Sequence, residues 1–559
     1  MAAADAEKNP KEEEEEERVG GEVLYFGSTA WDTMGRRPSN SFGNLISPTR
    51  LRTLVGVDIR FVASGSVSCH CVAVDTHGRC YTWGRNEKGQ LGHGDTLQRN
   101  LPTVVSGLSK YKIAKAGSGR SHTVVVTDDG KSFAFGWNKH GQLGSGSVKN
   151  EAHLSPVSCL ISQATDVACG GEFTMWLSSI EGSSILSAGL PQYGQLGHGT
   201  NREYNSKNSS VKLVYEPLPR PQAIAAFSEK TIVKVACGTN HTVAVDSSGF
   251  VYTWGYGGYG RLGHREQKDE WVPRLVDVFQ RKNVLPPDAV VSAGSANSAC
   301  TAGGGQLYMW GKIKNTGDDW MYPKPLMDLS GWNIHCMHSG HLHHVVGADD
   351  SCISWGAAQY GELGYGPHGQ KSSSNPKKIE SLDGIRIISV ACGTGLSAVV
   401  VDRKSAGECL DQLDIYDGDS SVEGVLDDTN VNGMAKSSAS PVKTPKNTNT
   451  KKRNKKEVPL PSSESESEDY GIKEEEDSED DTYGNGCVKK ANNKRGRGRP
   501  KGSSKTLTEV SGRGRGRPKG SSTSAVTTKV SGRSRGRPKS TETKLSGKGS
   551  RGRPKKSKS

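Results

Sequence analysis

The sequence predicts an all-β fold, a seven-bladed β-propeller, for residues 20–403. Two short sequence words each recur seven times in this region, with a period of roughly 50 residues. Gly accounts for 70 of the 559 residues, far above the usual share of ~7%. Apolar residues alternate with period two and form no sustained helical stripe. An all-β repeat of this length in seven copies is typical of a propeller.

The first word places an aromatic residue before Gly and continues to Gly-x-Leu-Gly. It reads YTWGRNEKGQLGHG from Tyr81 and YTWGYGGYGRLGH from Tyr252. The aromatic position falls at residues 26, 83, 135, 188, 254, 310 and 355, with Ala at 188. We expect these side chains to pack in the core and the Leu to fill the space between neighbouring blades. The Gly after the aromatic position permits tight turns and close approach of strands.

The second word is a turn of small residues and Gly, followed by a β-branched strand. It reads KAGSGRSHTVVVTDDG from Lys115 and VACGTNHTVAVDSSG from Val235. The Asp-Asp-Gly or Ser-Ser-Gly turn then joins this strand to the next one. Histidines recur at one position of the word, and their copies on separate blades cannot converge on one metal ion or substrate. We therefore predict a structural bond between strands or blades for His70, His122, His241 and His343.

The two ends of the repeat region are predicted to share one blade. The region begins with an aromatic-Gly word at Phe26 and ends with an Ala-Cys-Gly word at Cys392, whereas every interior repeat has both words. Pairing of the two ends would close the ring and leave no exposed sheet edge.

Several classes of function are not expected. None of the twelve cysteines forms a CxxC pair, and three of them recur in Ala-Cys-Gly, where a small core residue is expected. We therefore expect no metal, no cofactor and no disulfide framework. The sequence has no phosphate-binding loop, no HExxH motif and no nucleophile-base constellation, so we expect no enzyme. No apolar run approaches the ~18 residues of a membrane span, and residues 1–19 predict a disordered acidic N-terminus without a signal peptide.

The repeated words resemble those of the regulator of chromosome condensation repeat family, which forms seven-bladed propellers. Longer stretches, among them WGRNEKGQLGHGDT from Trp83 and MYPKPLMDLSGW from Met321, are similar to the regulator of chromosome condensation 2 type. That branch is associated with mitotic chromosomes and small GTPases. The resemblance implies that the propeller binds a protein partner, with a small GTPase as the candidate.

The resemblance also implies an alternative function, that of an active guanine nucleotide exchange factor for a Ran- or Rho-type GTPase. The founding member of the family acts on Ran and presents acidic residues in the loops just before the recurring histidines. Here those loops read GRSH, GEFT and GTNH, and Glu172 is the only acid among them. This departure weakens the expectation of Ran exchange and leaves Glu172 as a candidate contact to the partner.

The longest insertion between repeats runs from about residue 198 to 232. A long loop on a rigid scaffold is a common place for partner binding, and a tolerated surface insertion is the alternative. The candidate contacts in the insertion are Arg202, Tyr204, Lys207 and Lys212.

Residues 404–488 are predicted to form a disordered linker, because they are rich in Ser, Asp, Glu, Lys and Asn. Ser440 and Thr444 each precede Pro and are candidate phosphorylation sites. A basic cluster suited to nuclear import follows and predicts a nuclear protein. It consists of Lys451, Lys452, Arg453, Lys455 and Lys456.

Residues 489–559 form a basic tail with 24 Lys and Arg against two acids, a net charge of +22, so the remaining chain sums to −9. Four RGRP words, each followed by Lys, match the AT-hook, a motif for A·T-rich double-stranded DNA. We expect a chromatin-associated protein whose tail binds DNA, with a generic basic tail as the alternative. The DNA-binding candidates are Arg497, Gly498, Arg499 and Pro500; Arg515, Gly516, Arg517 and Pro518; Arg535, Gly536, Arg537 and Pro538; and Arg551, Gly552, Arg553 and Pro554.

Overall fold

The computed structural model describes residues 20–36, 43–205, 213–314 and 317–418. The chain divides into two units, residues 1–435 and 436–559, and every described residue belongs to the first unit. The candidate phosphorylation sites, the import cluster and the four RGRP words lie outside the described residues.

Strands dominate the described residues. Five four-stranded antiparallel sheets, together with two four-stranded groups that β1 and β3 join into one nine-stranded sheet, give seven groups, which we number as blades 1 to 7. In each blade the strands follow one another from the innermost to the outermost. Blade 1 has β3 (Ile59–Ala63), β4 (His70–Asp75), β5 (Cys80–Gly84) and β6 (Arg99–Val104). Blade 2 has β7 (Ile113–Ser118), β8 (His122–Thr127), β9 (Ser132–Trp137) and β10 (Ala152–Ser158). Blade 3 has β11 (Ala164–Cys169), β12 (Phe173–Ser178), β13 (Ile185–Gly189) and β16 (Leu218–Ala223).

The remaining blades repeat the same order. Blade 4 has β17 (Ile232–Cys237), β18 (His241–Asp246), β19 (Val251–Gly255) and β20 (Glu270–Leu275). Blade 5 has β21 (Val291–Ala293), β22 (Asn297–Ala302), β23 (Gln306–Gly311) and β24 (Trp320–Pro325). Blade 6 has β25 (Ile334–Ser339), β26 (His343–Ala348), β27 (Ser351–Gly356) and β28 (Ser373–Lys378). Blade 7 has β29 (Ile387–Cys392), β30 (Leu396–Asp402), β1 (Gly21–Gly27) and β2 (Leu45–Leu51).

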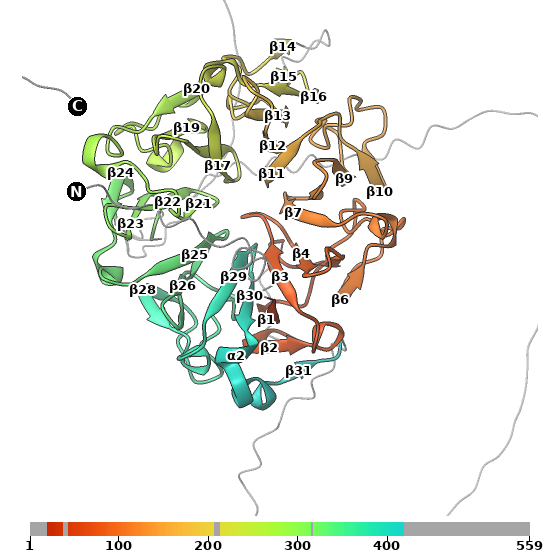
Figure 1. The fold of residues 1–559 in the computed structure, drawn as a ribbon, viewed down its shortest axis with the longest axis vertical. Helices are drawn as coiled ribbons and strands as arrows, with labels where there is room; N and C mark the ends of the chain where they lie inside the picture. The colour runs from red at the N-terminus through yellow and green to blue at the C-terminus, as the bar shows by residue number, and fades with distance from the viewer. Residues whose placement is uncertain (1–19, 37–42, 206–212, 315–316, 419–559) are drawn as a thin grey trace, which may run out of the picture. The chain divides into compact units, whose positions relative to one another are not determined.

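The innermost strands contact one another in sequence around a common centre, from β3 through β7, β11, β17, β21, β25 and β29 back to β3. Figure 1 shows the blades radiating from this centre, and the predicted all-β propeller is confirmed. Short helices lie mostly in the connections. They are η1 (Arg52–Leu54), η2 (Ser106–Leu108), η3 (Ala225–Phe227), η4 (Gly258–Gly260), η5 (Arg281–Asn283), η6 (Met327–Leu329), η7 (Glu380–Leu382), α2 (Arg403–Ala406) and η8 (Gly407–Gln412).

The two ends of the repeat region meet in blade 7. Strand β1 pairs with β30 over its whole length, from Gly21 opposite Asp402 to Gly27 opposite Leu396. This is the pairing that the half-repeats at the two ends predict. Buried Glu22 on β1 accepts a hydrogen bond from Arg50 at 2.6 Å and a second bond from Arg403. The ion pairs therefore tie β1 and β2 to the C-terminal end of the ring.

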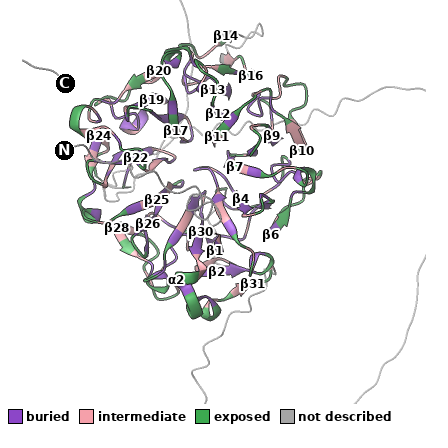
Figure 2. Cartoon of the chain, viewed as in Figure 1, coloured by how far each residue is buried: buried purple, intermediate pink, exposed green. Residues whose placement is uncertain are grey.

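Seven hydrophobic clusters form the core, and each lies between two adjacent blades. Each cluster contains one residue of the repeated aromatic position, as predicted, and at Ala188 the missing volume is supplied by Trp176 on β12. The Leu of Gly-x-Leu-Gly is buried in every full copy of the word, and Leu196 packs between Phe173 of blade 3 and Trp254 of blade 4. Figure 2 shows that the second and third strands of the blades are mostly buried, whereas the innermost strands are partly buried and the outer connections are exposed.

The folded region extends beyond the predicted boundary at residue 403. The chain continues through α2 and η8 to β31 (Ile415–Tyr416), which pairs in parallel with β2. Ala406, Leu410 and Tyr416 are buried against blade 7. The repeated words end before this segment, so the sequence pattern gave no signal for it, and the prediction of a disordered linker is wrong for residues 404–418.

The insertion before blade 4 also differs from its predicted form. Its Pro-rich part is the outermost strand β16 (Leu218–Ala223) of blade 3, and not part of a long loop. Pro is tolerated there because an outer edge strand does not need every backbone N–H for pairing. The rest of the insertion contains a two-stranded hairpin of β14 (Glu203–Asn205) and β15 (Leu213–Tyr215).

Candidate partner-binding face

Two connections of each blade lie at the same end of the sheet, because successive strands are antiparallel. In blade 3, Phe173 lies opposite Gly189, and Gly189 lies opposite Leu218. The connection before β12 and the connection after β13 therefore emerge side by side. In every blade these are the connection between the first and second strands and the connection between the third and fourth strands. We call the surface that they form the loop face.

The turns between first and second strands form a belt of backbone hydrogen bonds around the axis. The N–H of Arg120 donates to Gly171 at 3.1 Å, and the N–H of Gly171 donates to Thr239 at 2.9 Å. Further bonds of this kind join Ser295 to Gly340, His341 to Gly393 and Thr394 to Ser68. The belt needs residues without a Cβ, since a Cβ at Gly65 would lie 2.0 Å from the carbonyl oxygen of Ser118.

The turn of blade 1, residues 64–69, is longer than the others and crosses the axis. Buried Ser66 approaches Thr239 of blade 4 at 3.5 Å between hydroxyl oxygens, and Thr239 donates to Ser295 at 3.2 Å. Blades 1 and 4 lie on opposite sides of the ring. The centre of the loop face is therefore covered by hydroxyl side chains.

The recurring histidines join neighbouring blades, which confirms their predicted structural role. Nε2 of His70 lies 2.8 Å from Oγ1 of Thr123 in blade 2, and the Thr123 hydroxyl donates to the carbonyl of Gln90. Because that hydroxyl has one proton to donate, Nε2 of His70 must be the donor in its own bond. The same contact joins His122 to Thr174, His241 to Ser298 and His343 to Ser397. Burial lowers the pKa of His70 to about 3, so the ring is neutral.

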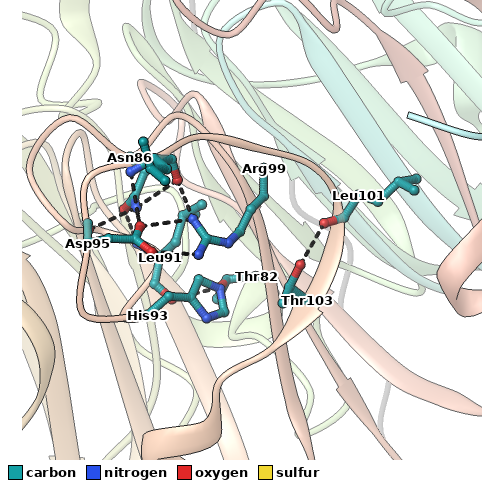
Figure 3. A network of polar contacts seen from close by, with 9 residues as sticks. Thr82, Asn86, Leu91, His93, Asp95, Arg99, Leu101 and Thr103 are labelled. Carbon is teal, nitrogen blue, oxygen red and sulfur yellow. Dashed lines mark hydrogen bonds and ion pairs between the residues drawn. The ribbon is translucent and has the colours of Figure 1, made fainter. Parts of the chain in front are cut away.

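The connections between third and fourth strands are held by internal polar networks, one of which is shown in Figure 3. In blade 1, Asn86 donates to the Asp95 side chain at 3.1 Å and accepts from the N–H of Leu91 at 2.9 Å. Arg99 donates to both Asp95 oxygens, at 2.9 and 2.7 Å, and this bonding lowers the pKa of Asp95 to about 2. His93 lies 3.0 Å from the Thr82 hydroxyl. These loops are therefore preformed.

Glu172, the acidic residue predicted to contact the partner, lies on the loop face among basic side chains. Its carboxylate is 3.7 Å from Nε of Arg120 and 3.4 Å from Nε2 of His140, and its side chain is only 16% exposed. Burial raises the pKa of Glu172 to about 7, against the opposing effect of Arg120, Lys139 and Lys88. Burial also lowers the pKa of His140 to about 4. The carboxyl group therefore titrates nearer to neutral pH than an exposed glutamate does, and it lies beside a neutral imidazole.

The candidates from the insertion lie at the same end of blade 3 as Glu172, since they follow β13. The N–H of Arg202 donates to the Thr200 hydroxyl at 3.0 Å, and Tyr204 belongs to β14. Lys207 and Lys212 lie outside the described residues. Arg202 and Tyr204 lie in the connection that leaves blade 3 at this end, and the structure gives no contact between Glu172 and Arg202.

Sequence reasoning missed the cations and aromatic rings of the loop face. Lys88 lies 5.0 Å from the centre of the Trp137 ring. Arg261, only 2% exposed, lies 4.5 Å from the Tyr256 ring and donates to the carbonyl of Ser295 at 2.7 Å. The signal for Arg261 was present in the sequence, because Arg replaces Gln of Gly-Gln-Leu-Gly at this position.

Within the described ranges, no three His, Cys, Asp or Glu side chains are grouped so that they could hold a metal ion. No helix in this part of the chain is both long enough and apolar enough to cross a membrane. The fold and its loops define a β-propeller with a preformed, polar loop face.

The sequence comparisons give the family. The regulator of chromosome condensation (RCC1) repeat matches residues 77–126, 129–177, 184–245, 248–301 and 349–400. Protein RCC2 of Homo sapiens is 41% identical over 413 residues, which cover 69% of this chain and 77% of the human protein. The chain belongs to the regulator of chromosome condensation repeat family and is of the RCC2 type.

Solved structures share the fold. Yeast RCC1 (Prp20) bound to Kap60 superimposes with a TM-score of 0.56 at 18% identity, covering 74% of this chain and 97% of that one. Prp20p of Saccharomyces cerevisiae, described with its binding properties to Gsp1p and histones, gives a TM-score of 0.53 at 18% identity over 72% of this chain and 98% of that one. At this identity the likeness concerns the fold alone.

Proposed function

We propose that this protein is a nuclear, chromatin-associated scaffold with two binding parts. Its C-terminal tail binds A·T-rich double-stranded DNA, and the loop face of its closed seven-bladed ring binds a protein partner, with a small GTPase as the candidate. The protein itself is not an enzyme. The observation that carries the proposal is the fourfold RGRP word, each copy followed by Lys, behind a propeller of this family.

The tail suits the minor groove of A·T-rich DNA, which is narrow and strongly negative. Gly498 has no Cβ, so the backbone can lie deep in the groove while Arg497 and Arg499 extend along its floor toward thymine O2 and adenine N3. The exocyclic amine of guanine obstructs this path. Four hooks linked in one tail multiply their weak individual affinities through effective concentration.

The loop face suits a protein partner, because its loops are fixed by internal hydrogen bonds before binding. The solved relative described with its binding to Gsp1p and histones motivates a GTPase or a chromatin protein as the partner. The candidate contacts are the exposed cations Lys88, Lys139 and Arg120, together with Glu172, whose carboxyl group is influenced by all three charges.

The surroundings of Glu172 favour a scaffold that only binds its partner over the alternative function, an active exchange factor. The Glu172 carboxylate lies beside Arg120 and has a pKa of about 7, so a full negative charge is not freely presented. Nucleotide release measured on a panel of Ran- and Rho-type GTPases separates the two functions. We expect the protein to bind a GTPase without accelerating release of its nucleotide. Accelerated nucleotide release that disappears in the Glu172→Gln variant would instead establish exchange activity.

The tail is tested by replacing all eight hook arginines with Lys in the full chain. This variant keeps every charge but loses the planar guanidinium groups that fit the groove floor. We expect it to lose the preference for A·T-rich over G·C-rich duplex at 150 mM salt, while charge-driven binding remains. The native tail should also show steep salt dependence, with a slope of roughly −0.9 per neutralised phosphate. A variant that keeps the native preference would mean that the tail is a generic polycation.

A further inference from the structure

The centre of the ring holds a cavity of about 640 Å³, lined by the inner strands of blades 1 to 6. At the loop face the turn 64–69 crosses the axis, where Ser66 meets Thr239. The cavity is therefore approached from the opposite end, where the inner strands begin. We call this end the cavity mouth.

Three cations from three blades lie near the cavity mouth. Arg60 and Lys115 line the cavity, and the Arg60 guanidinium donates to the carbonyls of Ile113 and Ala114 across the gap between blades 1 and 2. Lys115 and Lys234 occupy equivalent positions, each just after the irregularity near the beginning of its inner strand. Neither lysine forms an ion pair within 4 Å with another described residue.

Lys234 lies within the electrostatic influence of Lys115. Burial lowers the pKa of Lys234, and the Lys115 charge lowers it further, while Asp288 and Asp166 act in the opposite direction. Arg60 adds a third cation beside the two lysines. An anionic group between the lysines would relieve their repulsion.

The N-terminal segment enters the ring beside the cavity mouth. Gly21 pairs with Ile59 of the inner strand β3, and a Cβ at Gly21 would lie 2.9 Å from Cδ1 of Ile388 on the inner strand β29. Glu12 to Glu17 are six consecutive glutamates, and Glu17 is three residues before Gly20. An extended chain spans about 3.3–3.6 Å per residue, so the glutamates begin within roughly 10 Å of the point of entry.

We propose that the cavity mouth binds the acidic segment Glu12–Glu17 of the same chain, with Arg60, Lys115 and Lys234 as partners of its carboxylates. The short tether gives the segment a high effective concentration at this site. An acidic partner that reached the cavity would have to displace the segment first.

Lysine acylation of the full chain, quantified by mass spectrometry, tests the proposal. The comparison is with a full-length variant in which residues 12–17 are all Gln. We expect Lys115 and Lys234 to react about two- to fivefold more slowly in the native chain, the range for partly exposed ion pairs. Lys139 is the matched control, because it is exposed at the opposite end of blade 2 and should react equally in both chains.

Equal rates at Lys115 and Lys234 in the two chains would overturn the proposal. The proposal would also be overturned if both chains reacted slowly at these lysines and the acylation rates rose only after dialysis into buffer without phosphate. A small anion would then be the occupant of the site. A labelled peptide of residues 8–19 provides the second measurement. It should bind the all-Gln chain at low salt, and binding should be lost when Lys115→Gln and Lys234→Gln are added to that chain. Absence of binding to the all-Gln chain counts against the site.

Discussion

At the scale of single residues, the repeated words are dictated by close approach between blades. The Gly of the second word lies where the next blade's backbone occupies the space of a side chain, as at Gly65. The recurring His donates across the blade boundary, and the residue that accepts its bond is Thr or Ser in each case. The sequence could predict that these positions were structural. It could not predict Glu172 beside Arg120, because that contact joins turns of two different blades.

Gly65→Ala tests the belt of turns. The new methyl group would lie 2.0 Å from the Ser118 carbonyl oxygen, which is backbone and cannot rotate away. We expect a loss of roughly 3 kcal/mol or more in the free energy of unfolding, measured by denaturant titration. Gly304→Ala is the control, since no atom lies within 4 Å of its Cβ and only its positive φ of 85° is strained. That variant should lose about 1 kcal/mol, and equal losses in the two variants would contradict the argument.

At the scale of elements, the ring depends on a strand taken from the other end of the chain. The order of the words predicted that β1 completes the last blade, because each end carries half a repeat. The sequence did not predict the segment from α2 to β31, which has no repeat word and is placed by Leu410 and Tyr416. The hairpin β14–β15 was equally invisible, since a three-residue strand has too few residues to show alternation.

Glu22→Gln tests the closure of the ring without removing any strand. Glu22 is 1% exposed and pairs with both Arg50 and Arg403, so the amide would remove the buried carboxylate that the two guanidinium groups share and leave them only the more exposed Asp411 and Asp58. We expect a loss of about 1.5–3 kcal/mol in the free energy of unfolding, with the whole propeller melting in one transition at a lower temperature. Glu87→Gln is the control, because its pair with Arg36 is half exposed and should be worth about 0–1 kcal/mol. Melting of blade 7 alone, ahead of the other blades, would show that closure does not hold the ring together.

At the scale of the whole molecule, the chain separates its charges. The tail carries +22 and the rest sums to −9, so phosphate is attracted to the tail and repelled by the remainder. Within the propeller, seven similar interfaces close on one another, and four of them share the same neutral histidine contact. Conditions that act on these histidines therefore act on four interfaces together.

Acid should destabilise the propeller in a pH window set by these histidines. Burial lowers the pKa of His70, His122 and His343 to about 3 in the folded protein, whereas an unfolded His has a pKa of about 6.5. Between these values the unfolded state binds more protons, so the free energy of unfolding falls as pH falls from about 6.5 toward 3. The melting temperature should therefore fall between pH 7 and pH 5. This pH range lies above the range in which ordinary carboxylates titrate.

His122→Asn isolates one contribution, because blade 5 already uses Asn297 at this position, where it donates to Ser339 at 3.3 Å. Asn keeps a donor and cannot take up a proton, so the unfolded variant has one fewer site to protonate. The variant is expected to be less stable than the native protein at pH 7 and to lose less stability on going to pH 5. A pH dependence as steep as that of the native protein would mean that His122 is not held neutral in the folded ring.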